Sequence, residues 1–391
     1  MDFSLDARST LPEDSDKATL VGRIWRPDLA GPSVVTLRDG NLFDITAATP
    51  TMTELINAEN PTQAAQTASG EDMGPVETII ANSAIDSRDE TKPWLLSPVD
   101  LSALKAAGVT FVDSMLERVI EERAAGDPTA AEDIRRIIMD AIGDNLAAVV
   151  PGSPEAAALK GVLLERDMWS QYLEVGIGPD AEVFTKSQPM SAVGTGAEVG
   201  IHPGSSWNNP EPEIVLILGA DGSIVGATLG NDVNLRDFEG RSALLLGKAK
   251  DNNASCSLGP FIRLIDKSFA LDDIRQALLS MRVTGDDQFV LDGESSMQRI
   301  SRDISDLAGQ TLGAYHQYPD GAALFTGTAF APTKDRGTPG EGFTHKAGDI
   351  VSISSPKLGT LTNRVTTSDK AAPWTFGASA LMRNLAKRGL L

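Results

Sequence analysis

The second half of the sequence consists largely of short apolar segments that turn residues interrupt at close intervals. They follow about residue 173, are rich in β-branched residues, and read EIVLIL, SIVGATLG, GPFIRLI, QFVLDG, ALFTGT and DIVSISS. Short runs of this type, bounded by Gly, Pro, Asn and Asp, are typical of strands in an all-β or β-rich fold. Repeated βαβ units would alternate such runs with helical segments. The pattern therefore predicts an all-β or β-rich roll and argues against repeated βαβ units.

The length of the chain predicts two domains, since 391 residues exceed what one small core usually contains. We expect a small, mostly β N-terminal domain over residues 1–95. TLVGRIWR, SVVTLR and NLFDIT read as strands, and the Asp39-Gly40 pair between the last two predicts a hairpin. TMTELIN reads as a short helix, and residues 59–75, which are rich in Pro, Gly, Ser and Thr, read as a loop.

The remaining residues, 96–391, form the second predicted domain. We expect a helical insert over about 96–173, beginning with Ser97 as the cap ahead of Pro98. VDSMLERVIEERAAG and PEAAALKGVLLERDMWSQYL continue it with the helical period. The β-rich core would then occupy 174–391. Together these elements predict an α+β fold, in which a β-rich roll carries a helical insert and a small N-terminal domain.

The charge and cysteine content limit the classes of partner. A formal net charge of −20 repels phosphate backbones and anionic lipids, so we expect neither nucleic acid nor a membrane surface as partner. Cys256 is the only cysteine, which excludes a disulfide within the chain and fits a reducing compartment. The N-terminus lacks the apolar segment of a signal peptide, and no apolar run is long enough for a membrane span. These features predict a cytoplasmic protein.

Three carboxylates stand next to two consecutive strand-like runs. Glu211 and Glu213 flank Pro212 just ahead of IVLIL, and Asp232 ends the next run. Residues i and i+2 of a strand face the same side, so the glutamates would project together, and a hairpin could bring Asp232 beside them. A set of oxygens without histidine or cysteine suits Mg²⁺, Mn²⁺ or Ca²⁺. The alternative at this stage is a solvated strand edge that binds nothing.

Several motifs in order resemble the fumarylacetoacetate hydrolase superfamily, over roughly residues 96–391. The family pattern has Glu-x-Glu before a strand, Asn-Asp-x-x-x-Arg-Asp, and a lysine nine residues before Gly-Pro. The matching positions here are Glu211, Glu213, Asn231-Asp232, Arg236-Asp237, Lys250 and Gly259-Pro260. EVFTKSQP, with Lys186, and FTGT, with Thr328, resemble two further family segments. The resemblance implies that the β-rich roll is a mixed β-sandwich. It also implies that Glu211, Glu213 and Asp232 bind Mg²⁺ or Mn²⁺ and that Lys250 is on the substrate side.

One departure from the hydrolases and decarboxylases of this family is informative. In the register of their His-Glu pair, this chain has Ser114 and Glu117 within GVTFVDSMLERV. Serine cannot act as a base near neutral pH as imidazole does, which argues against hydrolysis of a carbon–carbon bond. WSQYLEV, SSWNNPEPE and GNDVNLRDFEGRSALLL resemble a narrower branch, the 2-keto-3-deoxy-pentonate dehydratases.

The resemblance to this branch implies a metal-dependent lyase. Its substrate would be a 2-keto-3-deoxy-pentonate such as 2-keto-3-deoxy-D-xylonate, and its products 2,5-dioxopentanoate and water. Loss of a C3 proton next to the 2-oxo group, with the metal as Lewis acid, would be followed by departure of the C4 hydroxyl. Glu117 and Lys250 are the catalytic candidates, without an assignment of acid and base. The candidates for substrate binding are Ser114, Lys186, Arg236 and Thr328.

Two other functions remain open from the sequence. A hydrolase of a 2,4-diketo acid would need a base other than Ser114 to activate water, and a non-catalytic sugar-acid binding protein would have no use for Glu117 and Lys250. The pairing of subunits in the family suggests a homodimer or homotetramer.

Overall fold

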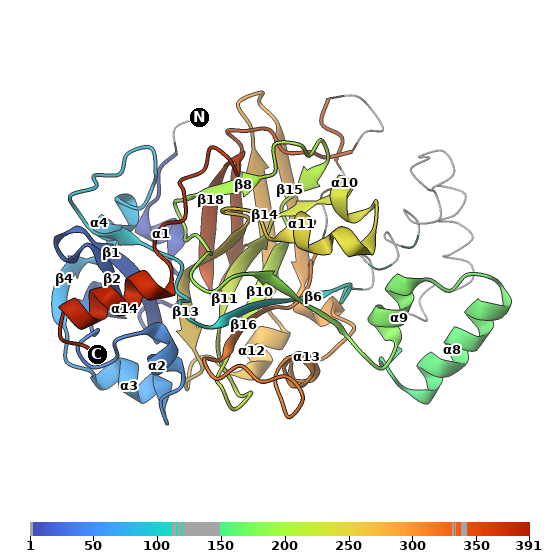
Figure 1. Cartoon of the computed structure of the whole chain (residues 1–391), viewed down its shortest axis with the longest axis horizontal. Helices are drawn as coiled ribbons and strands as arrows, with labels where there is room; N and C mark the ends of the chain where they lie inside the picture. The colour runs from blue at the N-terminus through green and yellow to red at the C-terminus, as the bar shows by residue number, and fades with distance from the viewer. Residues whose placement is uncertain are drawn as a thin grey trace.

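The computed structural model describes residues 3–111, 115, 119, 149–330, 332, 334–337 and 342–391. Two large sheets make up its body (Figure 1). The larger has eleven strands in the order β4-β3-β2-β1-β13-β11-β10-β16-β6-β7, with β5 paired to β1. Its strands are β1 Leu20–Arg26, β2 Gly31–Arg38, β3 Asn41–Asp44, β4 Glu71–Pro75, β5 Trp94–Leu95, β6 Ala103–Gly108, β7 Glu182–Ser187, β10 Pro212–Leu218, β11 Ile224–Asp232, β13 Cys256–Leu264 and β16 Ala322–Phe325.

The smaller sheet has five strands in the order β15-β14-β17-β18-β8. They are β8 Glu198–Ile201, β14 Leu278–Thr284, β15 Val290–Ser296, β17 Ile350–Ser355 and β18 Gly359–Thr367. A short ladder pairs β9 Asn208–Asn209 with β12 Asn234–Leu235. Most ladders in the large sheets are antiparallel; the parallel ones join β6 to β16 and β8 to β18.

The two large sheets pack face to face, with β10 at the centre. Every residue of β10 is buried, and its side chains alternate between two cores. Leu216 packs with Met281 and Ile353 of the five-stranded sheet, whereas Val215 and Ile217 face the core on the other side. A strand covered on both faces reads as an unbroken apolar run, which explains IVLIL. This confirms the predicted α+β fold with a mixed β-sandwich.

Helices cover the outer faces and edges of the sheets (Figure 1). Met52 and Leu55 of α2 pack on the second core, Ile304 and Leu307 of α13 pack on the core between the sheets, and α14 lies against β2. The helices are α1 Ala7–Thr10, α2 Met52–Ile56, α3 Pro61–Thr67, α4 Val76–Ala81, α8 Pro154–Glu165, α9 Gln171–Ile177, α10 Arg236–Glu239, α11 Leu246–Lys250, α12 Leu271–Arg275, α13 Ile304–Thr311 and α14 Ala378–Lys387, with 3₁₀ turns η1 Pro27–Leu29, η2 Ala243–Leu245 and η3 Met297–Arg299. Within the described residues, no helix has the length and apolar character that a membrane crossing requires.

The N-terminal strands extend the central sheet. Strand β1 pairs with β13 in the register Leu20↔Arg263, so residues 1–95 and 96–391 share one sheet. The hairpin at Asp39-Gly40 is confirmed: both residues have positive φ, 49° and 80°, and join β2 to β3. The prediction of a loop over 59–75 was wrong, because Asn60 caps helix α3 and β4 follows it.

The predicted helical insert needs a correction at its start. Residues Ala103–Gly108 are a strand, β6, whose backbone pairs with β16 on one side and β7 on the other. Ala, Leu and Lys favour helices, but tertiary pairing overrides this weak preference. Helices α8 and α9, with Ser153 and Ser170 as their caps, lie in the later part of the predicted insert. The predicted helical segment VDSMLERVIEERAAG lies almost entirely outside the described residues.

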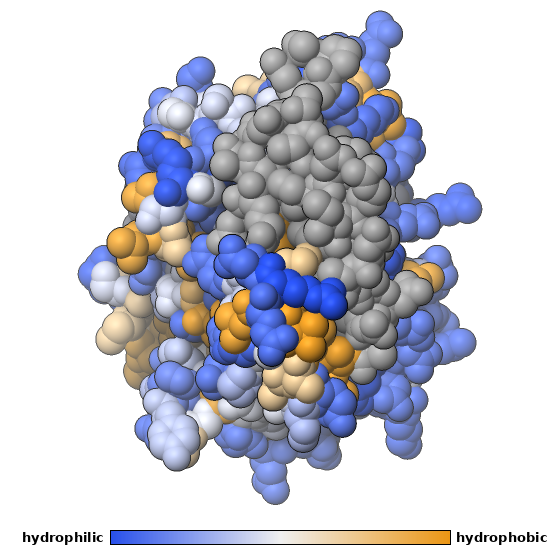
Figure 2. All heavy atoms as spheres, turned by 90° about the vertical axis from the view of Figure 1, so that its right-hand side faces the viewer, coloured by the Kyte–Doolittle hydropathy of each residue, from blue (hydrophilic) through white to orange (hydrophobic). Residues whose placement is uncertain are grey.

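Helices α8 and α9 form a lobe on the side of the body opposite β1–β4 (Figure 1). The lobe has its own small cluster of apolar side chains, which includes Met115, Leu163 and Leu173. Figure 2 views the molecule from this side and shows apolar and polar atoms close together on its surface. Leu164, at 56 % exposure, contributes apolar surface here.

Candidate metal and substrate site

Glu211, Glu213 and Asp232 come together in the structure. A carboxylate oxygen from each lies within 4.8 Å of the others, and all three residues are buried. The hairpin of β10 and β11 explains the arrangement, since Glu213 pairs with Gly230 and the Asp232 amide donates to the Glu211 carbonyl at 3.0 Å. The predicted geometry of these three side chains is therefore confirmed.

Two lysines neutralise most of this negative charge. The Lys250 ammonium, at the end of α11, donates to Glu211 Oε2 at 2.6 Å and to Asp232 Oδ2 at 3.0 Å. The Lys186 ammonium, on β7, lies 2.8 Å from Asp232 Oδ1. Burial acts to lower the pKa of Lys250, but the charges of Asp232 and Glu211 outweigh it and raise that pKa. These contacts favour the protonated, ammonium form of Lys250.

Glu213 is the carboxylate that most needs a further positive charge. Its burial, with the charges of Asp232 and Glu211, raises the pKa of Glu213 well above the usual value. Its Oε2 accepts a hydrogen bond of 2.6 Å from the amide of Gly327. A divalent cation that prefers oxygen ligands would relieve the repulsion among the three carboxylates. The donor set therefore fits Mg²⁺ or Mn²⁺.

Several neighbours of the triad were missed by sequence reasoning. Asn234 Nδ2 donates to Glu211 Oε1 at 3.1 Å and to Glu239 Oε2 at 2.7 Å. Asn234 stands two positions after Asp232, so the period of an extended chain was a usable signal. The Gly327 amide was also missed, although this residue lies in the FTGT segment. A backbone donor leaves no mark in residue type, so only the fold identifies it.

The other predicted substrate-binding residues have different surroundings. Arg236 is buried at the start of α10, with its guanidinium 5.4 Å from the centre of the Trp207 ring. Thr328 is half-buried and directly follows Gly327. The ammonium of Lys186 donates to backbone carbonyl oxygens next to the triad. Ser114 and Glu117 lie outside the described residues. The functional roles of all five residues stay predictions.

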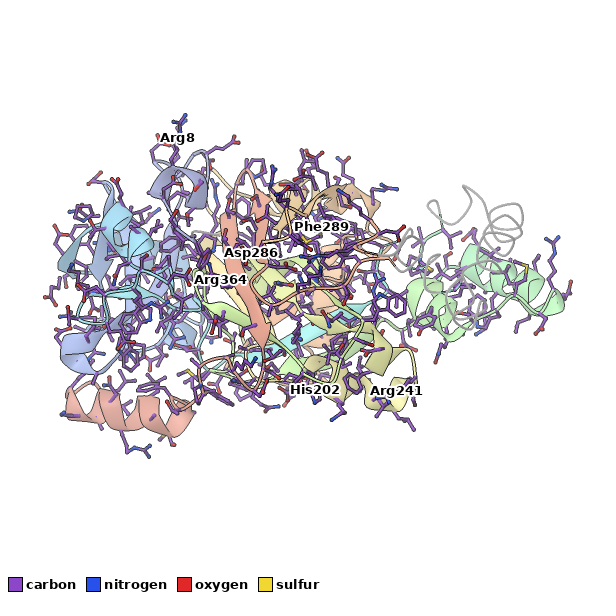
Figure 3. All side chains as sticks on the ribbon, turned by 90° about the horizontal axis from the view of Figure 1, so that it is seen from above. Arg8, His202, Arg241, Asp286, Phe289 and Arg364 are labelled. Carbon is purple, nitrogen blue, oxygen red and sulfur yellow. The ribbon has the colours of Figure 1, made fainter. Side chains whose placement is uncertain are left out.

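Helices α10 and α11 flank the triad and present cations around one aromatic ring. Arg241 and Lys248 lie 4.7 and 5.6 Å from the centre of the Phe238 ring, and His202 meets the same ring edge to face. Figure 3 shows His202 and Arg241 at one edge of the molecule. Asp237 has a structural place here, since it accepts hydrogen bonds from Ser205 and Ser206.

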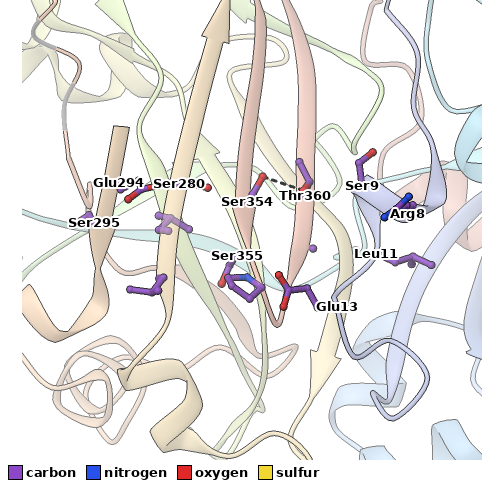
Figure 4. Close-up of a pocket in the computed structure, with 14 residues that line it drawn as sticks. Arg8, Ser9, Leu11, Glu13, Ser280, Glu294, Ser295, Ser354, Ser355 and Thr360 are labelled. Carbon is purple, nitrogen blue, oxygen red and sulfur yellow. Dashed lines mark hydrogen bonds between the residues drawn. The ribbon is translucent and has the colours of Figure 1, made fainter. Parts of the chain in front are cut away.

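A separate groove lies on the outer face of the five-stranded sheet (Figure 4). Arg8 of α1 and Glu13, just after this helix, line it together with Glu294, Ser354 and Thr360 of the sheet. Ser354 and Thr360 share a hydrogen bond of 3.0 Å across two strands. The groove contains no member of the triad. The triad, with its concentration of buried charge, is therefore the candidate site.

Sequence comparison places the chain among known proteins. A profile described as fumarylacetoacetate (FAA) hydrolase C-terminal matches residues 170–366, which include the triad and both lysines. A probable 2-keto-3-deoxyxylonate dehydratase of Haloferax volcanii is 30 % identical over 294 residues, or 72 % of this chain and 94 % of that protein. A 2-dehydro-3-deoxy-D-arabinonate dehydratase of Saccharolobus solfataricus is 31 % identical over 183 residues, 46 % of this chain and 57 % of the relative.

Structural comparison agrees with this result at the level of the fold. A 2-keto-3-deoxy-D-arabinonate dehydratase, solved as a complex with magnesium and 2,5-dioxopentanoate, superimposes with a TM-score of 0.59 and 18 % sequence identity. The match covers 89 % of this chain and 99 % of that one. The motifs, the matched profile and the relative from Haloferax volcanii lead to the same conclusion. This chain belongs to the fumarylacetoacetate hydrolase family.

Proposed function

We propose that this protein is a magnesium-dependent dehydratase, a carbon–oxygen lyase acting on a 2-keto-3-deoxy sugar acid. The preferred substrate in this proposal is a 2-keto-3-deoxy-pentonate such as 2-keto-3-deoxy-D-xylonate, and the products are 2,5-dioxopentanoate and water. The observation that carries the proposal is the buried triad of Glu211, Glu213 and Asp232, in a chain 30 % identical to a probable dehydratase of this type.

The charges around the triad support an anionic substrate. Three carboxylates and the ammonium groups of Lys186 and Lys250 leave one net negative charge, counted over these five residues. Magnesium at the three carboxylates would turn this into one net positive charge and would supply a Lewis acid to a 2-oxo group. A metal ion with two buried ammonium groups beside it favours an anionic substrate such as a 2-keto acid.

The side chains would then serve an elimination that needs no activated water. One proton leaves C3 of the substrate, and the C4 hydroxyl takes up a proton and departs as water. One proton then moves from C5 back to C3, which leaves an enol at C4 and C5. The enol ketonises when its hydroxyl proton moves to C4, and this step gives the aldehyde. In this scheme the Lys250 ammonium donates a hydrogen bond to a substrate oxygen at the reacting carbons. Glu117 removes and returns the protons that are bound to carbon. Arg236, Thr328 and Ser114 contact the carboxylate and the hydroxyl groups.

The test is product formation from a defined substrate. Purified protein is incubated with 2-keto-3-deoxy-D-xylonate and Mg²⁺, with and without EDTA, and the product is identified by NMR and mass spectrometry. We expect 2,5-dioxopentanoate, and we expect EDTA to abolish its formation. Glu211→Ala should lower kcat/KM by at least about a hundredfold, because stabilisation by the ion is worth several kcal/mol.

The matched control is Asp221→Asn. Asp221 is an acid in the turn at the far end of the same hairpin, where it accepts hydrogen bonds from Ser223. This variant should keep wild-type activity. Cleavage of a 2,4-diketo acid by the wild type, with no reaction of the deoxy sugar acid, would replace the lyase by a hydrolase.

A further inference from the structure

Lys186 has an environment unlike that of a residue that meets substrate. The whole residue is 0 % exposed, and its side chain reaches the triad from strand β7. Its ammonium lies 2.8 Å from Asp232 Oδ1, and it donates to the carbonyl oxygens of Lys250 at 2.6 Å and Val233 at 3.2 Å. An ammonium group has three N–H donors. With the Ser255 hydroxyl at 3.5 Å, four protein oxygens surround these donors.

These contacts connect Asp232 of the triad to Lys250. Asp232 Oδ1 lies against Lys186, and Asp232 Oδ2 accepts from Lys250, so the carboxylate is held between two cations. The carbonyl of Lys250 accepts from Lys186 and also from Ser255 Oγ at 2.7 Å. Lys186 thus orients a carboxylate of the triad and also holds the backbone of the residue whose side chain binds Glu211.

We propose that Lys186 is a positioning residue, which sets the orientation of Asp232 and the location of Lys250 and makes no contact with substrate. The inference rests on the proposed function for its catalytic part, because that part assumes that Lys250 acts on the substrate. Its metal-binding part depends only on the triad. Groups that orient metal ligands in this way commonly affect metal affinity by about ten- to a hundredfold.

The test is the variant Lys186→Met, which keeps a long unbranched side chain and removes the ammonium. Mg²⁺ binding is measured by calorimetry without substrate, and kcat and KM are measured at saturating Mg²⁺. We expect Mg²⁺ affinity to fall about tenfold or more. We expect kcat to fall by at least tenfold, while KM stays within about threefold of the wild-type value. Unchanged or tighter Mg²⁺ binding would overturn the metal part, and a tenfold rise in KM with little change in kcat would indicate a substrate contact.

The matched control is Lys105→Met. Lys105 is a nearly buried lysine on the neighbouring strand β6, and its ammonium donates to Thr185 Oγ1 at 3.0 Å. This variant should bind Mg²⁺ as the wild type does. If Lys186→Met does not fold, Lys186→Gln retains an N–H donor and is measured in the same way, with weaker Mg²⁺ binding again expected. Failure of the wild type to dehydrate any sugar acid would contradict the proposed function, while the Mg²⁺ titrations would still test the role of Lys186.

Discussion

Single residues near the triad owe their properties to burial. Glu213 has a raised pKa because it is buried beside two other acids. Cys256 stands opposite Asp232 in the β11–β13 ladder, and its burial raises the pKa of its thiol to about 12. A thiol with that pKa is almost entirely protonated near neutral pH, so Cys256 is suited to packing and not to nucleophilic chemistry. The burial that each position imposes, more than the residue type, therefore sets the pKa values of Glu213 and Cys256.

Gly327 is a residue-scale prediction. Its φ is 103°, and an added Cβ would lie 1.9 Å from Thr110 Oγ1. Gly327→Ala should therefore lower the free energy of unfolding by about 1–3 kcal/mol and displace the amide that donates to Glu213. Urea unfolding followed by circular dichroism measures the change. Gly309→Ala, in the last turn of α13 with nothing near the added Cβ, should be neutral or stabilising by up to about 1 kcal/mol. Equal stability of the two variants would contradict the argument.

At the scale of elements, a buried ionic cluster fastens the segment before β17. The Arg336 guanidinium donates to Asp349 Oδ1 at 2.8 Å and to Asp287 Oδ1 at 2.9 Å. His345 Nδ1 lies 3.2 Å from Asp349 Oδ2. Burial lowers the pKa of His345, against the opposing effect of Asp349. Burial acts to raise the pKa of Asp349, but hydrogen bonds from His345 and Arg336 outweigh it and lower that pKa.

Both shifts predict a loss of stability in acid. His345 is held neutral in the folded state, so its contribution is present above its unfolded pKa of about 6.5 and is lost as the pH falls below it. Asp349 adds a further loss as the pH falls below 3.8, towards its lowered folded pKa. Thermal melting between pH 7.5 and 5 should show a falling Tm in the wild type. His345→Gln should start from a lower Tm and show a flatter dependence; an equally steep fall in the variant would exclude His345 as the cause.

At the scale of the whole molecule, the N-terminal strands complete the core of the rest. Phe261 packs with Ile24 and Val35 in a cluster that spans β1, β2 and β13. The guanidinium of Arg23, on β1, donates to the carbonyls of Ser97 and Val99 just beyond residue 95. Strand β13 thus has β1 on one side and β11 on the other. The N-terminal region is bound to the body by a shared ladder, a shared core and a buried guanidinium.

Removal of residues 1–95 should therefore destabilise the remainder. A fragment of residues 96–391 would leave β13 as an unpaired edge with Phe261 uncovered, which favours aggregation. We expect its Tm to lie at least about 10 °C below that of the full chain, since loss of several kcal/mol shifts Tm by this amount. Differential scanning fluorimetry and gel filtration provide the measurement. A monodisperse fragment that melts within a few degrees of the full chain would show that β1 contributes little.

The local features of the sequence determined much of the site and of the fold. The period of two in a strand places Glu211 and Glu213 together, and a short turn returns the chain so that Asp232 meets them. Asp39-Gly40 likewise determines its own hairpin, because both residues tolerate positive φ. These are short-range effects, which depend on neighbours along the chain.

The tertiary structure decided what depends on distant partners. Ala103–Gly108 became a strand because β16 and β7 pair with it, against the helical preference of its residues. Lys186 is surrounded by oxygens of Asp232, Val233 and Lys250, which lie far along the sequence, and Glu213 accepts a hydrogen bond from the amide of Gly327. A residue type shows which bonds a side chain can make. The partners it meets, and whether water still reaches it, follow only from how the sheets pack.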